Sequence, residues 1–336
     1  MTAVRPLLTD LTEAAGLTAA PGTATVVCLP YAGGGAFGYL PLARALHEEG
    51  KPLRVLAADL PGRDRDDDRP AVPADRLTAD LAQEIAGAVP GDVVLLGHSS
   101  GTGPALTAGM ALCAMGRPAA RLVAVAGLPP SSEDLDDHPA RAAAALPDAE
   151  LFAGFAGFAG SAVAPADTDA DSSEPGTDHV PRTDHVPRTD HLPPTGRLPL
   201  TDHLPPTIQP PPADQLSPEE RADIARAFRY DVRTALDCFA TAHREAGRNG
   251  TAALGCPVTA LLAEDDPSLA GRRNDVRGWA LFGTALRVAW TEEGGHYLNT
   301  SRPRFLASGI PYESPVAPTP PEEPDHAPYD APYDRP

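Results

Sequence analysis

The sequence predicts an α/β domain built on a mostly parallel sheet with helices on both faces. Short apolar, β-branched runs alternate with longer segments whose apolar residues have helical spacing, which is the pattern of successive β-α-β units. The apolar runs lack a polar alternation, as expected for strands buried on both faces. With 336 residues, 42% of them hydrophobic, the chain is long enough to bury a sizeable core.

The alternation runs from Thr23 to Pro130 and resumes late in the chain. We expect strands at residues 23–30, 53–62, 92–99 and 120–130, separated by helices at 37–50, 74–89 and 103–116. Two further strands are expected at 256–267 and 285–296, with a short helix at 275–284 between them. Parallel strands joined by helices need crossover connections of this length.

A composition break follows a segment at 146–160 that has helical spacing. From Thr177 the chain carries a six-residue repeat, TDHVPR or a variant of it, with a proline in every unit. Proline removes backbone donors and blocks regular helix or sheet, so we expect about 164–214 to form a disordered, proline-rich insertion. The histidines of the repeat lack cysteine neighbours and a rigid frame, so we expect no metal site there.

Order is expected to return at Ser217. This serine can cap a helix, Pro218 suits its first position, and Glu220 completes a capping box. The last residues are acidic and rich in proline, as is typical of a disordered tail. We therefore divide the chain into an N-terminal extension (1–22), a first core segment (23–130), a helical lid that contains the insertion (131–235), a second core segment (236–310) and a tail (311–336).

Charge and composition exclude several classes of partner. A net charge of −19 argues against nucleic acid and against anionic membrane surfaces, both of which attract basic proteins. The N-terminus lacks the pattern of a signal peptide, and no apolar run has the length of a membrane span, so a cytoplasmic location is expected. The four cysteines have neither zinc-site nor disulfide-framework spacing.

One motif points to nucleophilic chemistry. Residues 97–101, Gly-His-Ser-Ser-Gly, fit the pattern G-x-S-x-G with Ser99 in the middle, between a buried strand and a helix. In that context the pattern predicts a nucleophile elbow, a strained turn that exposes the serine oxygen above the sheet. The glycines at positions 97 and 101 are expected to relieve crowding between the strand and the helix.

A serine nucleophile needs a base, and the base needs a carboxylate that orients it. On this type of fold the order along the chain is Ser, then Asp or Glu, then His. The last two predicted strands are followed by Glu264-Asp265-Asp266 and by Gly-Gly-His296. His296 is the expected base. The acid is Asp265 or Asp266, because Glu264 still follows the strand directly and has a longer side chain.

The remaining requirement is a pair of donors for the oxyanion of a tetrahedral intermediate. One is expected to be the backbone N–H of Ser100, which follows the nucleophile. The second is expected from the glycine-rich loop at residues 30–37, with Ala32 as the donor. This loop lacks the phosphate-binding signatures GxxxxGK[ST] and GxGxxG. The chemistry needs no cofactor and no metal.

Seven stretches together resemble the type II thioesterases of polyketide and nonribosomal peptide biosynthesis. They are LPYAGGGAFGYLPLARAL, LPGRDRD, LLGHSSG, LPDAELF, FRYDVRTA, LLAEDDP and GGHYLNT. The resemblance covers most of the chain from Thr23 to Phe305 and implies an α/β-hydrolase fold with a helical lid. It implies hydrolysis of stalled or misprimed acyl groups from the phosphopantetheine arm of acyl or peptidyl carrier proteins. It assigns Ser99 as nucleophile, His296 as base and Asp266, directly before proline, as acid.

The sequence departs from this family at three places: Ser100 stands where the family usually has methionine, the lid carries the insertion, and the tail is long.

Two other functions stay open at this point. One is a different hydrolase or acyltransferase of the same fold that acts on small-molecule esters. The other is a module that binds carrier proteins with little turnover, against which the complete triad argues. Arg272, Arg273 and Arg277 could contact a carrier, but a solvated helix face is the favoured interpretation.

Overall fold

A computed structural model of the chain describes residues 6–63, 69–135, 137–148, 150–151, 217–249 and 253–312. The predicted insertion and nearly all of the predicted tail lie outside these residues. The strands form one seven-stranded sheet in the order β1-β3-β2-β4-β5-β6-β7, in which β1 is antiparallel to β3 and all other neighbours are parallel. The strands are β1 (Leu8–Asp10), β2 (Thr25–Leu29), β3 (Arg54–Ala58), β4 (Val93–His98), β5 (Arg121–Val125), β6 (Val258–Ala263) and β7 (Leu286–Thr291).

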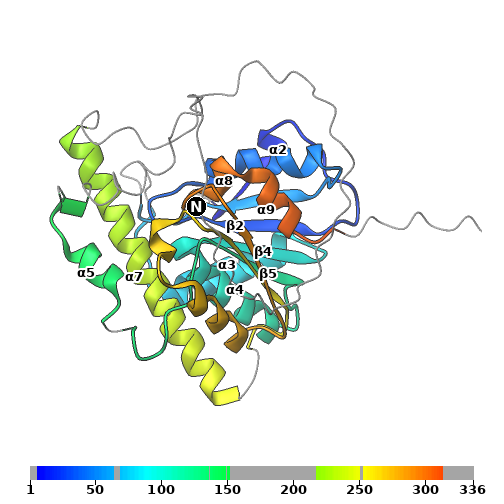
Figure 1. Ribbon diagram of the computed structural model, residues 1–336. Helices are drawn as coiled ribbons and strands as arrows, with labels where there is room; N and C mark the ends of the chain where they lie inside the picture. The colour runs from blue at the N-terminus through cyan, green and yellow to red at the C-terminus, as the bar shows by residue number, and fades with distance from the viewer. Residues whose placement is uncertain are drawn as a thin grey trace, which may run out of the picture.

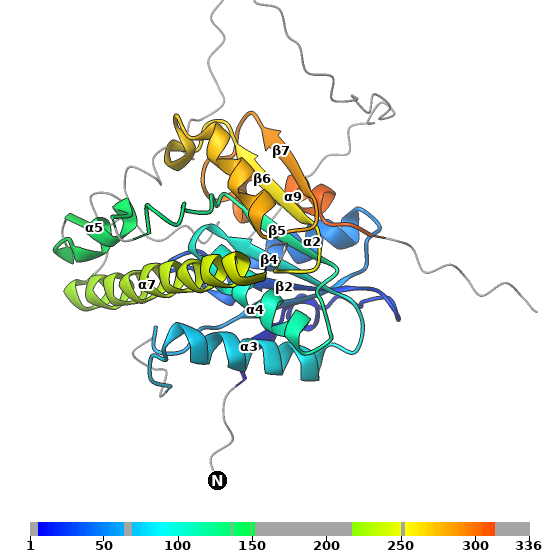
Figure 2. The same cartoon turned by 90° about the horizontal axis from the view of Figure 1, so that it is seen from below.

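Helices cover both faces of this sheet, which confirms the predicted layers (Figures 1 and 2). One face carries α1 (Leu11–Ala14), α2 (Leu40–Glu48), α8 (Leu298–Ser301) and α9 (Pro303–Gly309). The other carries α3 (Ala74–Ala88), α4 (Thr102–Ala114) and α7 (Pro218–Asn249). Four 3₁₀ helices lie in the connections: η1 (Ala36–Tyr39), η2 (Ser99–Gly101), η3 (Pro267–Leu269) and η4 (Arg273–Leu281).

The core has two halves because successive strand residues point to opposite faces. In β2, Val27 and Leu29 pack under α3 and α4, whereas Val26 and Cys28 pack under α2 and α9. All four side chains are buried, as are the corresponding residues of β4 and β5. The near-continuous apolar runs of the sequence follow from this burial on both faces.

The N-terminal segment contributes an edge strand that the sequence pattern did not predict. Leu8–Asp10 pairs with β3 from Ala58 to Leu56. Asp10 then caps α1 by accepting hydrogen bonds from the N–H groups of Thr12 and Glu13, and its other oxygen lies 2.7 Å from Nε of Arg54. Three residues are too few to show a periodicity, and so the strand left no signal.

Helix α7 is one continuous helix of 32 residues that belongs to both lid and core. Its predicted capping box is confirmed: the N–H of Glu220 donates to Oγ of Ser217, and the N–H of Ser217 donates to the Glu220 carboxylate. The predicted boundary between lid and core, at 235/236, lies inside this helix. The second half of α7 packs in the core through residues such as Phe239 and Ala242.

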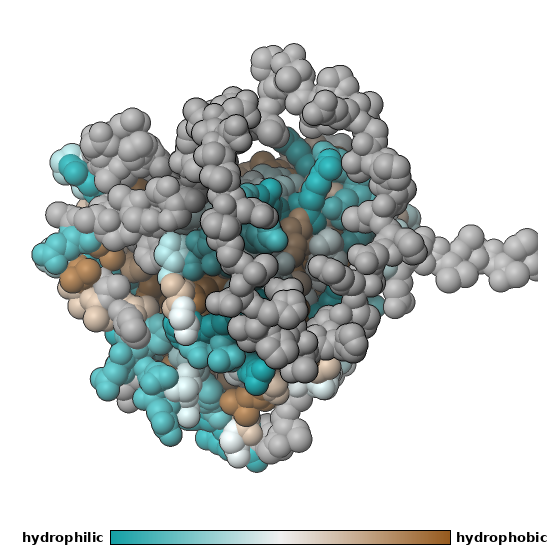
Figure 3. Space-filling view, viewed as in Figure 1, coloured by the Kyte–Doolittle hydropathy of each residue, from teal (hydrophilic) through white to brown (hydrophobic). Residues whose placement is uncertain are grey.

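The other described lid element, α5 (Pro139–Ala145), runs beside the first half of α7 (Figure 2). The guanidinium of Arg229 on α7 donates to the carbonyls of Ala144 and Leu146 and forms an ion pair with Asp148. Hydrophobic surface is exposed where α5 lies, and Leu146 is 37% exposed there (Figure 3). Among the described helices, none combines the length and the apolar character that crossing a membrane requires.

Candidate active site

Ser99 stands at a strained turn between β4 and α4. Its φ is +50°, and it is one of two non-glycine residues with a positive φ in the described part of the chain. The other is Ala126, at the end of β5 with φ +47°. Both residues line the same pocket. Left-handed backbone at non-glycine residues costs free energy and gathers at functional sites, so the strain marks the ends of these neighbouring strands.

The two glycines of the motif stand where no side chain fits. A Cβ on Gly97 would lie 2.5 Å from Cα of Thr102, and a Cβ on Gly101 would lie 2.3 Å from the carbonyl oxygen of Leu29. These contacts are far inside van der Waals distance. The glycines therefore let the helix start directly behind the strand, as we expected from the motif, and this close packing holds Ser99 above the sheet.

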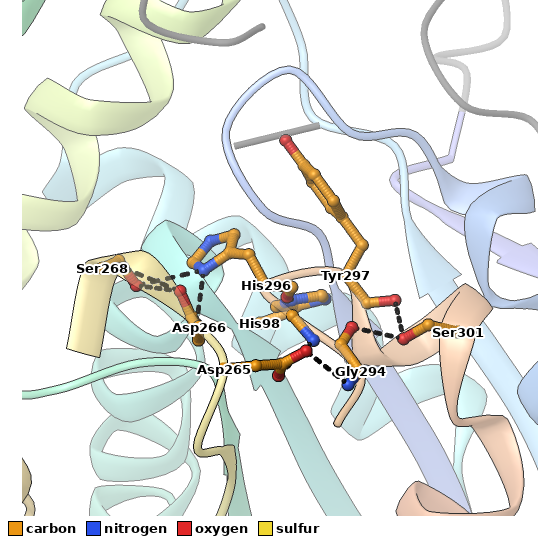
Figure 4. Close-up of polar contacts among 9 residues, drawn as sticks. His98, Asp265, Asp266, Ser268, Gly294, His296, Tyr297 and Ser301 are labelled. Carbon is orange, nitrogen blue, oxygen red and sulfur yellow. Dashed lines mark hydrogen bonds and ion pairs between the residues drawn. The ribbon is translucent and has the colours of Figure 1, made fainter. Parts of the chain in front are cut away.

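His296 and Asp266 meet at the same end of the sheet, from the loops after β7 and β6 (Figure 4). Nδ1 of His296 lies 2.9 Å from Oδ2 of Asp266, whose side chain is fully buried. Oδ1 of Asp266 accepts hydrogen bonds from the N–H and the hydroxyl of Ser268. Burial acts to raise the pKa of Asp266, but the hydrogen bonds from His296 and Ser268 outweigh it and hold the pKa below its ordinary value. The carboxylate is thus charged and oriented toward the imidazole.

Asp265 has a different partner. Its carboxylate accepts hydrogen bonds from the N–H groups of Gly294 and Gly295, at 3.1 and 2.8 Å. Both glycines have positive φ values, +140° and +59°, and form the turn that leads into His296. Of the two acids that the sequence left open, the structure therefore places Asp266 on the imidazole and Asp265 on the backbone of the turn before it.

His98 also holds the loop that carries His296. Its Nε2 lies 2.7 Å from the backbone carbonyl of His296, and its ring packs edge-on against Tyr31. Burial is the main cause that lowers the pKa of His98 to about 3, with the neighbouring His296 as a smaller cause. The motif pattern assigns no role to His98, which is one of its variable residues. The signal available in the sequence was a histidine at the end of an apolar run, directly before the serine.

The glycine-rich loop lies beside Ser99, and two of its backbone donors are engaged within the protein. The N–H of Gly33 donates to the carboxylate of Asp231 on α7, and the N–H of Gly34 donates to the carbonyl of Tyr31. Ala32 lines the pocket, and within the described part of the chain its N–H has no hydrogen-bond partner. The N–H of the predicted loop donor is therefore available to a ligand.

A pocket of about 390 Å³ connects these groups. Ser99, Ser100, Ala32 and His296 lie in its wall, and the remaining lining is mainly apolar. Much of the apolar wall comes from one face of α7: Phe228, Val232, Ala235, Leu236 and Phe239. The arrangement offers a polar end with a serine, an imidazole and backbone donors, next to an apolar chamber that suits a hydrocarbon chain.

Two of the three arginines that were considered as carrier contacts, Arg272 and Arg273, are engaged in local contacts. Arg272 forms an ion pair with Asp275, and Arg273 forms one with Glu264 while lying over the ring of Trp290. The contacts of Arg273 suit a solvated face of η4, whereas Arg272, the residue before η4, also lines the pocket. In the described part of the chain, no group of three or more His, Cys, Asp or Glu side chains could hold a metal ion.

Comparison with known proteins finds a match to one family model, over part of the chain, and a group of solved structures that share one fold. Residues 24–173 match the model of the thioesterase domain family. A comparison with curated proteins finds no match. Among solved structures, the type II thioesterase BorB from the borrelidin biosynthetic cluster is 21% identical with a TM-score of 0.53, over 89% of this chain and 94% of its own.

Two further solved structures agree with this fold. RedJ, a thioesterase from the prodiginine pathway of Streptomyces coelicolor, is 18% identical with a TM-score of 0.55, over 85% of each chain. YbtT, the type II thioesterase of a yersiniabactin pathway, is 17% identical with a TM-score of 0.53, over 90% of this chain and 95% of its own. The chain has the α/β-hydrolase fold of these proteins, as the sequence predicted.

Proposed function

We propose that this chain, whose residues 24–173 match the thioesterase domain family, is a serine thioesterase that releases acyl groups from the phosphopantetheine arm of carrier proteins. The observation that carries the proposal is the meeting, at one end of the sheet, of a strained serine with a histidine that is hydrogen-bonded to a buried carboxylate. The pathways named for the similar structures, borrelidin and yersiniabactin among them, support polyketide or nonribosomal peptide synthases as the source of these carriers.

The first half of the reaction forms an acyl-enzyme. Oγ of Ser99 attacks the thioester carbonyl carbon while Nε2 of His296 accepts its proton. The N–H groups of Ala32 and Ser100 stabilise the oxyanion of the tetrahedral intermediate. The C–S bond then breaks, and His296 returns the proton to the thiolate of the carrier arm. Asp266 keeps Nδ1 protonated and stabilises the imidazolium.

The second half releases the product. His296 accepts a proton from water, whose oxygen attacks the acyl carbon of the Ser99 ester. The intermediate collapses to a free acid, and Ser99 regains its proton from His296. The apolar wall supplied by α7 holds the hydrocarbon part of the acyl group during both steps. No part of this sequence of steps requires a cofactor.

The test compares substrates at equal acyl length. The enzyme is incubated with acyl groups loaded on phosphopantetheinyl carrier proteins, with the same groups on free pantetheine and with their simple oxygen esters, and free acid is measured. We expect the highest kcat/KM on the carrier-bound thioesters and no release by the Ser99→Ala variant. Preference for the oxygen esters would instead indicate a hydrolase of small-molecule esters. Binding of carriers without release of acid would indicate a binding module.

A further inference from the structure

A buried ion pair ties the lid helix to the glycine-rich loop beside Ser99. Oδ2 of Asp231, on α7, lies 2.7 Å from a terminal nitrogen of Arg63 and accepts the N–H of Gly33 at 2.8 Å. The same guanidinium nitrogen donates to the carbonyl of Gly34. Asp231 is only 4% exposed, so the pair is removed from solvent. One carboxylate and one guanidinium thus hold the backbone of two consecutive residues of the loop, Gly33 and Gly34.

This loop needs an external support because its own sequence provides little rigidity. Three glycines follow Ala32, and Gly33 has a φ of +77°, a conformation that glycine adopts freely but does not maintain by itself. The hydrogen bond from Gly34 to Tyr31 is the loop's own turn contact. Ala32 lines the pocket, so the placement of its N–H depends on what fixes the next residue, and the N–H of that residue, Gly33, is bound by Asp231.

The pair is poorly explained as a device for stability. Among the described residues, Oδ1 of Asp231 and Nε of Arg63 are buried without a hydrogen-bond partner. Burial raises the pKa of Asp231 to about 6, despite the opposing charge of Arg63. Apolar side chains in these positions would avoid both costs, since buried ion pairs are often neutral or unfavourable for folding. The charged side chains of Asp231 and Arg63 are better explained by a need to hold the glycine-rich loop in one position.

Three consecutive residues of α7 reach three different parts of the molecule. Arg229 binds the end of α5, the hydroxyl of Tyr230 donates to the carbonyl of Val72 at 2.9 Å, and Asp231 binds the loop. Successive residues of a helix point about 100° apart, so one turn can serve all three. The same turn of α7 therefore positions part of the pocket wall and also the loop that carries the proposed oxyanion donor.

We infer that Asp231, together with Arg63, is a positioning residue that sets the oxyanion donor of the loop according to the placement of the lid helix. The inference rests on the proposed function of the site. A lid helix in its packed position holds the Ala32 N–H toward the reacting carbonyl, and loss of the Asp231 contact releases the loop while leaving Ser99, His296 and Asp266 in place.

The experiment separates transition-state stabilisation from binding and from folding. Four quantities are measured for the wild type and for Asp231→Ala: kcat and KM on one acyl thioester, affinity for a trifluoromethyl ketone analogue that forms a tetrahedral adduct with the serine, and affinity for a non-hydrolysable thioether analogue. We expect kcat and ketone affinity to fall together by about 10- to 100-fold, below or near the effect of deleting an oxyanion donor outright, and thioether affinity to stay within about threefold.

The control is Asp10→Asn, which breaks an ion pair of the same 2.7 Å length with Arg54 at the far edge of the sheet. We expect it to leave all four quantities unchanged. If Asp231→Ala does not fold, Arg63→Lys keeps the charge but removes the guanidinium that joins Asp231 to Gly34, and it should lower kcat and ketone affinity together.

The outcomes are distinguishable. A folded Asp231→Ala variant with unchanged kcat and ketone affinity would overturn the inference, as would an equal loss of ketone and thioether affinity, which indicates a general structural defect. If the wild type cleaves no thioester but still forms the ketone adduct, the proposed function fails, and the adduct affinities of the variants still decide the role of Asp231.

Discussion

Nε2 of the buried His98 lies 2.7 Å from the backbone carbonyl oxygen of His296, so one histidine of the site holds the peptide of the other. A carbonyl oxygen only accepts hydrogen bonds, which places the proton of His98 on Nε2. Burial, with a smaller effect of His296, lowers the pKa of His98 to about 3. His98 is therefore neutral in the folded protein at every pH at which the enzyme is expected to work.

This lowered pKa predicts a loss of stability in acid. Between pH 6.5 and 3 the unfolded chain binds a proton at His98 and the folded chain does not. The contribution of His98 to the free energy of unfolding is therefore fully present above pH 6.5 and is lost as the pH falls toward 3. From pH 7 to 4.5, protonation linked to His98 should lower the free energy of unfolding of the wild type by roughly 2–3 kcal/mol. Urea unfolding at both pH values should show this difference between the wild type and His98→Gln. An equal pH dependence of the two proteins would contradict it.

The two adjacent serines should respond differently to substitution. We expect Ser99→Ala to abolish hydrolysis with the fold retained, because Ser99 alone has the strained backbone of the turn. Ser100→Ala should keep substantial activity, because the Ser100 hydroxyl is buried without a partner in the described chain and its expected contribution is a backbone N–H. Acid release and circular dichroism of both variants provide the measurement. An active Ser99→Ala enzyme would rule out Ser99 as nucleophile.

The two adjacent aspartates form a matched pair. Asp266→Asn should lower kcat by roughly 10²- to 10⁴-fold, because the imidazole loses the charge that holds its tautomer and stabilises its protonated form. Asp265→Asn should lower it by less than about tenfold, because an amide oxygen can still accept one of the glycine N–H groups. Steady-state kinetics on one acyl thioester compares them. A reversed order of the two effects would move the acid to Asp265.

The packing of the elbow predicts a large effect of a single methyl group. Gly101→Ala places a Cβ 2.3 Å from the carbonyl oxygen of Leu29, which only a backbone shift can relieve. We expect the free energy of unfolding to fall by more than about 2 kcal/mol. Gly87→Ala is the control: its Cβ meets nothing within 4 Å inside α3, and it should raise stability by about 0.5–1 kcal/mol. Denaturant unfolding of both variants tests this.

Local patterns were sufficient for most of the fold. The strands from β2 to β7 stand out as short apolar runs and the helices α2, α3 and α4 by their helical periodicity, and their predicted positions are confirmed within a few residues. The elements that were missed are β1, α1, α5, α8 and α9, which have 3 to 7 residues. Segments this short are stabilised by tertiary contacts, such as the pairing of Leu8 with Ala58, and show no clear period of their own.

In the candidate site, too, residues with a local sequence signal could be predicted, and residues placed by long-range contacts could not. Ser99 lies in a local motif, and His296 and the pair Asp265-Asp266 follow predicted strands, so the order of elements was enough to select the serine, the histidine and this pair of acids. Choosing between Asp265 and Asp266 from the residues alone was not possible, because the choice depends on where two loops from different strands meet. The contact of Asp231 with Gly33 joins residues 198 positions apart and leaves no local signal.

The continuity of α7 bears on how enzymes of this kind could be recombined. Because one helix supplies both the pocket wall and part of the core, it cannot be divided at 235/236 without mixing two packing environments. At Gly103, a Cβ would lie 2.7 Å from the carbonyl oxygen of Ala235, so α4 and α7 are fitted to each other at that crossing. A chimera that imports a new lid should therefore take the whole of α7, and it should inherit the facing side of α4 from the same donor.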